Sequence, residues 1–314
     1  MSIAFVFPGQ GSQAVGMGAA LGTIYPAARD VFAEVDEALG QNLSRLMWEG
    51  PENELVLTEN AQPALMAVSL AAIRVLTEEK GFKLGDKVAF VVGHSLGEYS
   101  ALAAAESLSV ADTARLLKIR GKAMQEAVPV GDGAMAALLG ADLDQARALA
   151  AAAAEAQVCE AANDNAPGQV VISGARAAIE RAVKLGPQFG ARRAVLLPVS
   201  APFHCALMKP AADAMHEALN KVEIKAPAVP LVANVLASAI SEPEAIRACL
   251  VEQVTGMVRW RESMMYLQAQ GVTGVYEVGA GKVLSGIARR FEGLQAANVG
   301  TPDELEAAAT ALAG

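Results

Sequence analysis

Cysteine is scarce in this chain, and long apolar runs are missing. Its 314 residues include only three cysteines, Cys159, Cys205 and Cys249, which lie far apart in the sequence. This number and spacing argue against a disulfide framework and indicate a reducing, cytoplasmic compartment. The longest apolar run, Ala148–Ala154, is far shorter than the roughly 18 residues that a membrane span needs. We therefore expect no membrane partner, and the short apolar start of the chain does not resemble a secretory signal.

Positive charge is also in deficit. The chain has 25 lysines and arginines against 34 aspartates and glutamates, a formal net charge of −9, which argues against nucleic acid as a partner. The three cysteines and three histidines form no cluster with metal-ligand spacing, so we expect neither a metal nor a redox cofactor. A hydrophobic content of 53% excludes general disorder and provides for a sizeable core.

Apolar segments alternate with helical patterns in most of the chain. Ile3–Phe7 and Val88–Val92 have the composition of strands, and the second is apolar throughout, as in a strand buried on both faces of a parallel sheet. Helices are expected to begin at Ser95 and near His204. This alternation predicts an α/β fold built on a parallel sheet.

The segment between residues 129 and 198 has a different order of elements. Glycine and proline precede it and Pro198 closes it. The expected strands are Ala134–Leu139, Val158–Ala162, Gln169–Ser173 and Arg193–Leu197, and the expected helices are Asp142–Ala154 and Ala175–Leu185. The order βαββαβ is that of ferredoxin-like modules. We therefore expect a small ferredoxin-like subdomain over 129–198, inserted into a larger subdomain that comprises 1–128 and 199–314.

The segment Gly93–Gly97, Gly-His-Ser-Leu-Gly, matches the G-x-S-x-G pattern and follows the expected strand Val88–Val92. In this context the serine lies on a sharp turn between strand and helix, with its hydroxyl exposed at the end of the sheet. Ser95 is therefore a candidate nucleophile, and the Leu96 amide lies close to it. The alternative is a serine that only caps the helix, but the flanking strand and helix favour the nucleophile.

A serine nucleophile needs a base, and the chain has three histidines. His94 adjoins Ser95, so its side chain should point away and serve the structure. His216 lies well inside a helix and is expected at the surface. His204 precedes a helix, where the helix dipole disfavours the imidazolium and keeps the ring neutral. By elimination His204 is the candidate base, with a buried structural histidine as the alternative. The acidic limb of the pH–rate profile is then expected near the reference histidine pKa of about 6.5.

Seven segments, in the same order along the chain, resemble those of the malonyl-CoA:acyl-carrier-protein transacylases. They are Phe7–Gln13, Gly93–Glu98, Lys118–Gly121, Asn165–Gly174, Pro202–Met208, Glu252–Val254 and Tyr276–Leu284. Together they are distributed over nearly the whole chain and are highly specific, whereas G-x-S-x-G alone is shared with lipases and esterases. The resemblance implies an α/β-hydrolase-like large subdomain with a parallel sheet and a ferredoxin-like insertion, which agrees with the order of elements above.

The resemblance also implies roles for individual residues. Ser95 would be acylated and His204 would be its base, with the backbone carbonyl of Gln253 orienting the imidazole in place of an aspartate. The backbone N–H groups of Gln10 and Leu96 would form the oxyanion hole.

Two residues would select the acyl group by the same resemblance. Arg120 would hold the free carboxylate of malonyl bidentately, and Gln10 lies at the same substrate site. Phe203 would fill the space that a methyl branch needs. The alternatives are a surface arginine on the helix Val110–Ala127 and a core aromatic at 203.

The resulting hypothesis is an acyltransferase of fatty-acid synthesis. Malonyl would pass from coenzyme A to a serine ester, and then to the phosphopantetheine thiol of acyl carrier protein, in a ping-pong reaction. Malonyl-CoA and the carrier protein are the expected partners, no cofactor is needed beyond the thioester substrate, and the chain is expected to act as a monomer. The alternatives are a serine esterase or thioesterase, which usually has an HGGG-type loop that this sequence lacks, a trans-acting acyltransferase of a polyketide synthase, and a non-catalytic docking subunit.

Acidic carrier proteins would need a basic patch on this acidic chain. The candidates are Arg192 and Arg193 in the insertion, and Lys282, Arg289 and Arg290 after Gly281. The alternative is that these are ordinary solvated charges.

Overall fold

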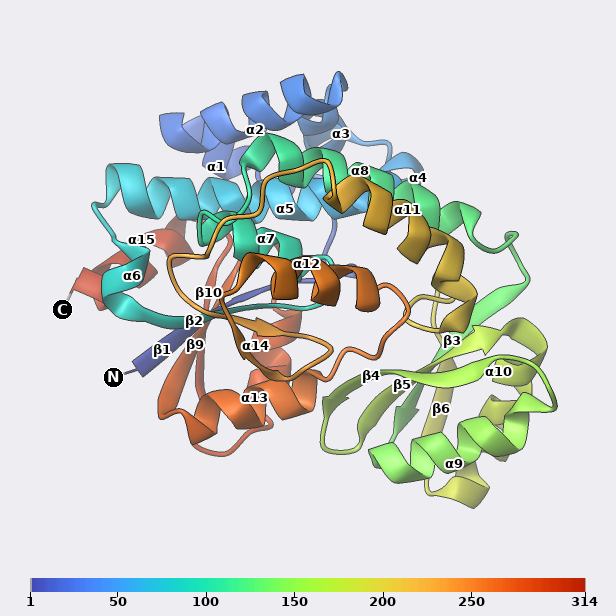
Figure 1. The fold of residues 1–314 in the computed structure, drawn as a ribbon. Helices are drawn as coiled ribbons and strands as arrows, with labels where there is room; N and C mark the ends of the chain where they lie inside the picture. Colours follow the sequence, from blue (N-terminus) through green and yellow to red (C-terminus); the bar gives the residue numbers. More distant parts are fainter. Residues whose placement is uncertain (1, 314) are drawn as a thin grey trace.

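Two β-sheets organise the chain in a computed structural model that describes residues 2–313 (Figure 1). The larger sheet has six strands in the order β10-β9-β1-β2-β7-β8. Their bounds are β1 Ser2–Phe7, β2 Val88–Gly93, β7 Leu231–Ala233, β8 Ser238–Ile240, β9 Val272–Val278 and β10 Gln295–Val299. All neighbours pair in parallel except β7 and β8, which are antiparallel. The α/β class with a parallel sheet is confirmed, whereas the sequence analysis did not predict the short edge strands β8 and β10.

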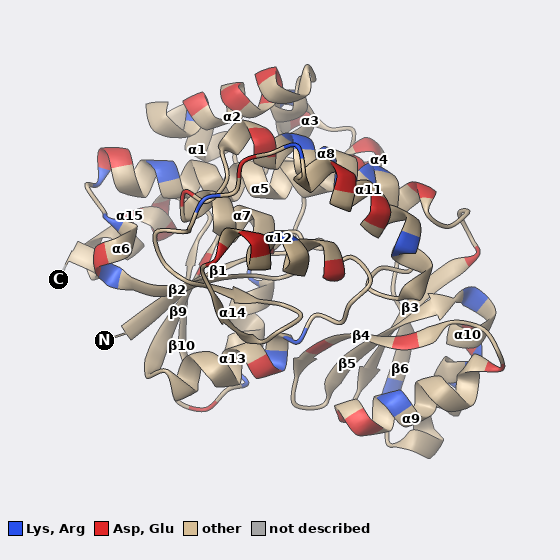
Figure 2. Ribbon diagram, viewed as in Figure 1, with Lys and Arg blue, Asp and Glu red and all other residues tan. Residues whose placement is uncertain are grey.

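The central strands are apolar because both faces of the sheet are covered. Along β1, Phe5 and Phe7 belong to one core, while Ala4 and Val6 belong to a second core on the opposite face. Neither β1 nor β2 contains a charged residue, and Figure 2 shows charges of both signs on the surrounding helices. Successive residues of a strand point to opposite faces, so a strand between two cores is apolar throughout.

Helices cover the two faces unequally. The first core includes side chains from α1 Ala19–Ile24, α2 Pro26–Leu39, α3 Leu43–Glu49, α4 Glu52–Leu55, α5 Thr58–Arg74, α6 Leu84–Lys87, α7 Gly97–Ala104, α8 Val110–Glu126, α11 Lys209–Leu219, α12 Pro243–Glu252 and α15 Pro302–Ala313. The second core is smaller and includes α13 Trp260–Ala269 and α14 Val283–Ala288. Figure 1 shows α5 and α8 on one side of the large sheet and α13 on the other.

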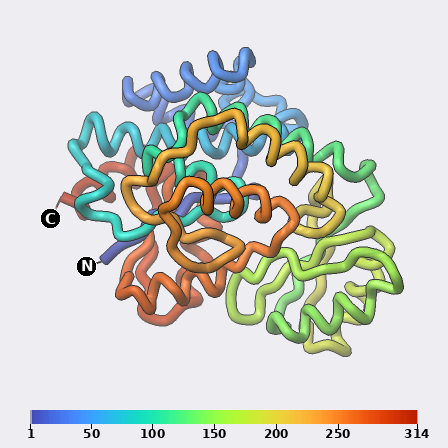
Figure 3. The backbone as a smooth tube through the Cα atoms, viewed as in Figure 1, coloured from blue at the N-terminus to red at the C-terminus, as the bar shows by residue number. Residues whose placement is uncertain are grey.

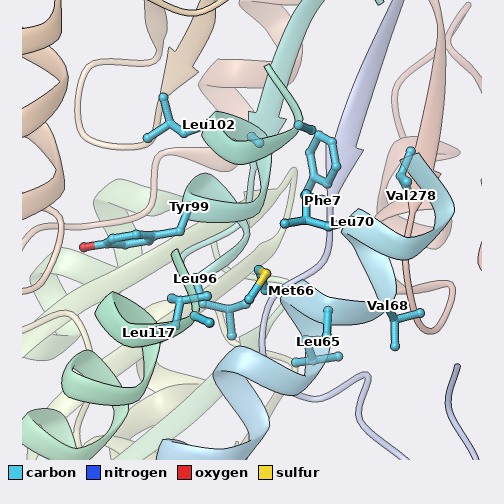
Figure 4. Close-up of a cluster of buried hydrophobic side chains, with 14 of the residues drawn as sticks. Phe7, Leu65, Met66, Val68, Leu70, Leu96, Tyr99, Leu102, Leu117 and Val278 are labelled. Carbon is cyan, nitrogen blue, oxygen red and sulfur yellow. The ribbon is translucent and has the colours of Figure 1, made fainter. Parts of the chain in front are cut away.

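The first core also fixes the turn that carries the candidate nucleophile. Figure 4 shows Leu96, the residue after Ser95, among Met66 of α5, Leu117 of α8 and Tyr99 of α7. The side chain of Leu96 is 1% exposed. The turn is therefore held from below by packed apolar side chains.

The smaller sheet has four antiparallel strands in the order β4-β5-β3-β6. Its elements are β3 Gly133–Leu139, α9 Leu143–Ala154, β4 Cys159–Ala166, β5 Gln169–Ala175, α10 Arg176–Leu185 and β6 Arg193–Leu196. The βαββαβ order is confirmed, and the strand order is that of a ferredoxin-like module. Strand β4 extends to Ala166, beyond the expected end at Ala162, because its last residues continue to pair with β5.

Strand β4, at one edge of the small sheet, contacts α13 and the segment that leads into it, which cover the large sheet. Asn163 forms a parallel bridge with Val258, and the buried carboxylate of Asp164 accepts a hydrogen bond from Arg261 Nε at 2.8 Å. The chain passes from the large sheet to the small one and back only once, as the tube in Figure 3 shows. The boundary between the two sheets, here called the seam, is also held beside the carboxyl end of β2, where His94 Nε2 lies 2.9 Å from Asn165 Oδ1 of β4. Among the described helices, none has both the length and the apolar character needed to cross a membrane.

Candidate active site

A cavity of about 700 Å³ lies at the seam between the two sheets. Residues of the small sheet line it, together with residues of the loops and helices around the large sheet. Among the lining residues are six that the sequence analysis singled out: Gln10, Ser95, Leu96, Arg120, Phe203 and His204. The seventh, Gln253, is fully buried directly behind this lining. The structure therefore brings all seven residues together, although they are distributed over most of the chain.

Ser95 lies on a sharp turn between β2 and α7. Its φ angle is +53°, a left-handed conformation that is costly for a serine and typical of the nucleophile turn. A Cβ on Gly93 would lie 1.8 Å from the carbonyl carbon of Gly97, and a Cβ on Gly97 would lie 2.2 Å from Phe7 O, so only glycine fits at either position. Because Ser95 adopts this turn, α7 begins at Gly97 and not at Ser95 as expected.

Asn234, at the end of β7, holds this turn in place. Its Oδ1 accepts a hydrogen bond from the Ser95 N–H at 2.8 Å, and its Nδ2 donates to the Gly93 carbonyl at 2.6 Å. The sequence analysis did not identify Asn234. The available signal was an asparagine at the end of an apolar segment, which the structure shows to be fully buried. Its partners are about 140 residues away in the sequence, so only the fold reveals them.

His204 lies within hydrogen-bond distance of Ser95. Its Nε2 is 2.8 Å from Ser95 Oγ, and its Nδ1 is 2.9 Å from the backbone carbonyl oxygen of Gln253. An Nδ1–H that donates to this carbonyl leaves Nε2 as an acceptor for the serine proton. His204 also has a positive φ of +58°. His204 precedes a helix as expected, but the 3₁₀ turn Ala206–Met208 lies between them, so the helix expected to begin near His204, α11, begins at Lys209.

The environment of His204 keeps the imidazole neutral. Burial and, to a smaller extent, the nearby positive charge of Arg120 together lower the pKa of His204 to about 3, against the opposing effect of the hydrogen bond to Gln253. The expectation of an ionisation near 6.5 is therefore wrong for the free protein. The cause also differs from the predicted one, since desolvation and a cation, and not a helix end, disfavour the imidazolium.

The other two histidines occupy separate environments. His94 is half-buried, with Nε2 2.9 Å from Asn165 Oδ1 and its ring centroid 5.3 Å from that of Trp260. Burial lowers its pKa. His216 is exposed on α11. Neither is hydrogen-bonded to Ser95, so the geometry agrees with the elimination that left His204.

Arg120 is buried beside Ser95, with only 1% of its surface exposed. Its Nη1 donates to Gln62 Oε1 at 2.8 Å, and its Nη2 donates to Gln253 Oε1 at 2.8 Å and to Ser95 Oγ at 3.1 Å. The alternative of a surface arginine is therefore wrong. Helix α8 can bring Arg120 this close to α5 because Gly121 packs against Thr58, where a Cβ would lie 2.5 Å from the carbonyl oxygen.

The guanidinium has no carboxylate partner within salt-bridge distance among residues 2–313. Its three hydrogen-bond partners are neutral, and its Nε has no partner among the described residues. Burial lowers the pKa of Arg120, although the group stays charged because its reference value is so high. A buried cation with unused donors is suited to receive an anion. Gln62, which the sequence analysis missed, is a fully buried polar residue near the start of α5.

The backbone N–H groups of Gln10 and Leu96 lie at the same cavity. Within residues 2–313 neither donates to another backbone group. Gly9 brings the Gln10 loop against the nucleophile turn, since a Cβ at Gly9 would lie 2.9 Å from the His94 carbonyl oxygen. Two available N–H groups beside a serine hydroxyl are the arrangement that an oxyanion hole requires.

Phe203 is 9% exposed and lines the cavity next to His204. The same ring also belongs to the first core. Its position is therefore compatible both with the predicted role in limiting the acyl pocket and with the alternative of a core aromatic.

The five candidate docking residues are all exposed, but two of them have intramolecular partners. Lys282 pairs with Glu304 at 2.7 Å. Arg290 donates to Gln169 Oε1 and to the Pro167 carbonyl oxygen, and so fastens the turn between β4 and β5. Arg289 is the remaining candidate in this region, and its guanidinium forms no ion pair with another of residues 2–313.

Comparison with known proteins places these observations in a family. Residues 4–295 match the model of the acyl transferase domain. The malonyl CoA-acyl carrier protein transacylase of Escherichia coli K12 is 48% identical over 97% of this chain and 98% of its own length. An acyl-carrier-protein S-malonyltransferase from Bartonella henselae has 56% identity and a TM-score of 0.97, with both chains covered completely. A malonyl-transacylase in complex with its type II PKS acyl-carrier protein has 44% identity and a TM-score of 0.95, over 99% of this chain and 100% of its own. The chain belongs to the malonyl-CoA:acyl-carrier-protein transacylase family.

Proposed function

We propose that this protein transfers malonyl from coenzyme A to the phosphopantetheine thiol of acyl carrier protein through a malonyl ester on Ser95. Membership of the transacylase family supports the reaction. The observation that carries the residue roles is the 2.8 Å contact between Ser95 Oγ and His204 Nε2, with the buried cation of Arg120 beside it.

In the first half-reaction His204 Nε2 accepts the proton of the Ser95 hydroxyl while Oγ attacks the thioester carbonyl. The negative charge that develops on the carbonyl oxygen is stabilised by the N–H groups of Gln10 and Leu96. Collapse of this intermediate breaks the carbon–sulfur bond, and His204 returns the proton to the coenzyme A thiolate. The Gln253 carbonyl accepts the Nδ1–H throughout, which fixes the tautomer.

In the second half-reaction the carrier thiol replaces coenzyme A. His204 Nε2 accepts the thiol proton, the thiolate attacks the serine ester, and the proton returns to Ser95 Oγ. The same residues thus serve both directions. The complex of a related malonyl-transacylase with a type II PKS acyl-carrier protein supports a carrier protein as the acceptor, and both fatty-acid and polyketide carriers fit this chemistry.

Arg120 selects a carboxylate-bearing acyl group in this proposal. Malonyl differs from acetyl by one carboxylate, and the guanidinium lies against the hydroxyl that becomes acylated. When the carboxylate arrives, it pairs with a cation that otherwise has only neutral partners. This feature favours the transferase over a general esterase or thioesterase, whose acyl group needs no cation, and the assembled Ser95–His204 pair disfavours a non-catalytic docking subunit.

We further propose that residues 129–198 form a subdomain inserted between 1–128 and 199–314, supported by the separate four-stranded sheet and its own core. A cytoplasmic location is supported by the three cysteines, all of which are free and buried. The monomeric state remains a proposal that size-exclusion chromatography with light scattering would test.

Intact-mass spectrometry tests the catalytic proposal directly. The protein is mixed with malonyl-CoA in the absence of carrier, and the expected result is a stable gain of one malonyl group, located on Ser95 by peptide mapping. Ser95→Ala should gain nothing, while its circular dichroism spectrum stays unchanged. Malonylation of the variant at another residue, or rapid release of malonate by the original protein without a thiol acceptor, would contradict the proposal.

A further inference from the structure

The first turn of α7 contains a buried carboxyl group that the mechanism above does not use. Glu98, three residues after Ser95, is 0% exposed. Its Oε2 accepts hydrogen bonds from Gln253 Nε2 at 2.7 Å and from the Asn234 N–H at 3.2 Å, whereas its Oε1 has no partner among the described residues. Burying a carboxyl group is costly unless it is hydrogen-bonded, so its presence at this position calls for an explanation.

The side chain of Gln253 connects this carboxyl group to Arg120. Gln253 Nε2 donates to Glu98 Oε2 and, at 3.0 Å, to the Ser95 carbonyl oxygen, so both of its N–H groups are used. Its Oε1 therefore faces the opposite way and accepts from Arg120 Nη2 at 2.8 Å. If the amide were flipped, its carbonyl oxygen would face the carboxyl oxygen of Glu98 and its N–H groups would face the guanidinium. The acceptor at Glu98 excludes that orientation.

Three ionisable side chains lie close enough to Glu98 to interact with it electrostatically: Arg120 from α8, Tyr99 from α7 and Cys249 from α12. Asn234 on β7 and Gln253 contribute neutral groups. Burial raises the pKa of Glu98 to about 7, against the lowering effects of its hydrogen bonds and of Arg120. In the acidic form Oε1, which has no partner, can carry the proton while Oε2 continues to accept. The contact with Gln253 is therefore independent of the charge on Glu98.

We propose that Glu98 is a positioning residue for malonyl selectivity: by accepting from Gln253 Nε2, it turns the oxygen of that amide towards Arg120 and holds the guanidinium where the acyl carboxylate binds. This inference rests on the proposed function, in which Arg120 receives the carboxylate. Glu98 itself touches neither Ser95 Oγ nor the cavity. It acts through Gln253, whose amide contacts Glu98, Ser95 and Arg120 at once.

The test compares Glu98→Leu with Glu98→Gln. Leucine is similar in size but cannot accept a hydrogen bond, so Gln253 is free to flip and Arg120 loses a fixed partner. Glutamine can place its oxygen at the Oε2 position and its amide nitrogen at the position of Oε1. It then has an acceptor at the first position and a donor at the second, like the protonated acid. The measurement is the second-order rate constant of acyl-enzyme formation with malonyl-CoA and with acetyl-CoA, from rapid quenching and intact-mass spectrometry.

Glu98→Leu should lower the ratio of malonyl to acetyl rate constants at least tenfold, and Glu98→Gln should keep the ratio within about threefold of that of the original protein. The matched control is Glu277→Gln. Glu277 is also a fully buried carboxyl group, and it accepts from Leu284 and Ser285 at the start of α14. This control should lower the melting temperature without changing the ratio, because both substrates carry the same coenzyme A.

Two results would overturn the proposal. If Glu98→Leu slowed malonyl and acetyl in parallel, Glu98 would support only the serine turn or the fold. If Glu98→Gln lost the ratio as fully as Glu98→Leu, charge and not hydrogen-bond acceptance would be the property that matters.

Should Glu98→Leu fail to fold, Gln253→Met carries the same test, because it removes the amide and leaves Glu98 in place. It should lower the ratio at least tenfold, and an unchanged ratio would refute the proposal. Failure of the proposed function would look different: the original protein would not be malonylated on Ser95, whatever the variants at Glu98 do.

Discussion

Replacing Arg120 with alanine should invert the acyl preference of this protein and not simply reduce its activity. The guanidinium is 1% exposed and bonded only to neutral groups, so a malonyl carboxylate would gain charge-assisted hydrogen bonds in a largely desolvated site. Two such bonds at about 1.5–3 kcal/mol each, if half-realised, amount to about 1.5–3 kcal/mol, or roughly 10- to 150-fold in rate constant. With acetyl the same substitution removes an unpaired buried cation, so acetyl transfer should hold steady or rise.

The assay follows acyl-enzyme formation on Ser95 with malonyl-CoA and acetyl-CoA in parallel. Arg120→Lys should recover only part of the malonyl rate, because a lysine keeps the charge but loses the planar fork that holds a carboxylate at two points. A parallel decrease in the malonyl and acetyl rates of Arg120→Ala would refute the reasoning and make Arg120 a structural residue.

Three further predictions concern the base, the acyl pocket and the carrier surface. Because the pKa of His204 is lowered to about 3, the ring stays neutral as pH falls, so kcat/KM for malonyl-CoA should stay level from pH 6.5 to 5. The measurement uses Glu98→Gln, which removes a buried carboxyl group whose pKa is raised to about 7, and an acidic limb near 6.5 would show that the pKa of His204 is not lowered. Phe203→Ser should raise methylmalonyl relative to malonyl transfer about tenfold, since a methyl-sized space is worth roughly 1–3 kcal/mol; an unchanged ratio would place the ring in the core. Arg289→Glu should raise the KM for carrier protein several-fold and leave that for malonyl-CoA unchanged, whereas Arg45→Glu, at an exposed site on α3, should change neither. Equal effects of Arg289→Glu on both substrates would exclude a docking role.

The sequence predicted the features that depend on neighbouring residues. The strand, turn and helix around Ser95 are contiguous, and so their identity could be inferred from glycine spacing and apolar composition. The same holds for the βαββαβ order of the small sheet. The first residues of helices were predicted less well, because Ser95 and His204 both adopt positive φ angles that delay the helices expected to begin there.

The roles of the buried polar residues around the cavity could not be predicted from the sequence. Gln62, Asn234 and Glu98 are each buried, and their partners belong to other elements of the fold. A buried amide acquires its role only when the fold brings a donor or acceptor against it. The short strands β8 and β10 were not predicted for a related reason, since such short segments form strands only when they can pair with the edge of a neighbouring strand.

The residues around the cavity fall into two groups, one on each side of the seam between the sheets, and the two groups have different roles. Ser95, His204, Arg120 and Gln253 all belong to elements on the side of the large sheet, whereas the small sheet contributes lining side chains such as Met135 and Val171. Substitutions on the small sheet can therefore reshape what enters the cavity while the proton-transfer geometry stays fixed. With this architecture, the preference for an acyl group or a carrier can diverge among related enzymes while the catalytic residues stay the same.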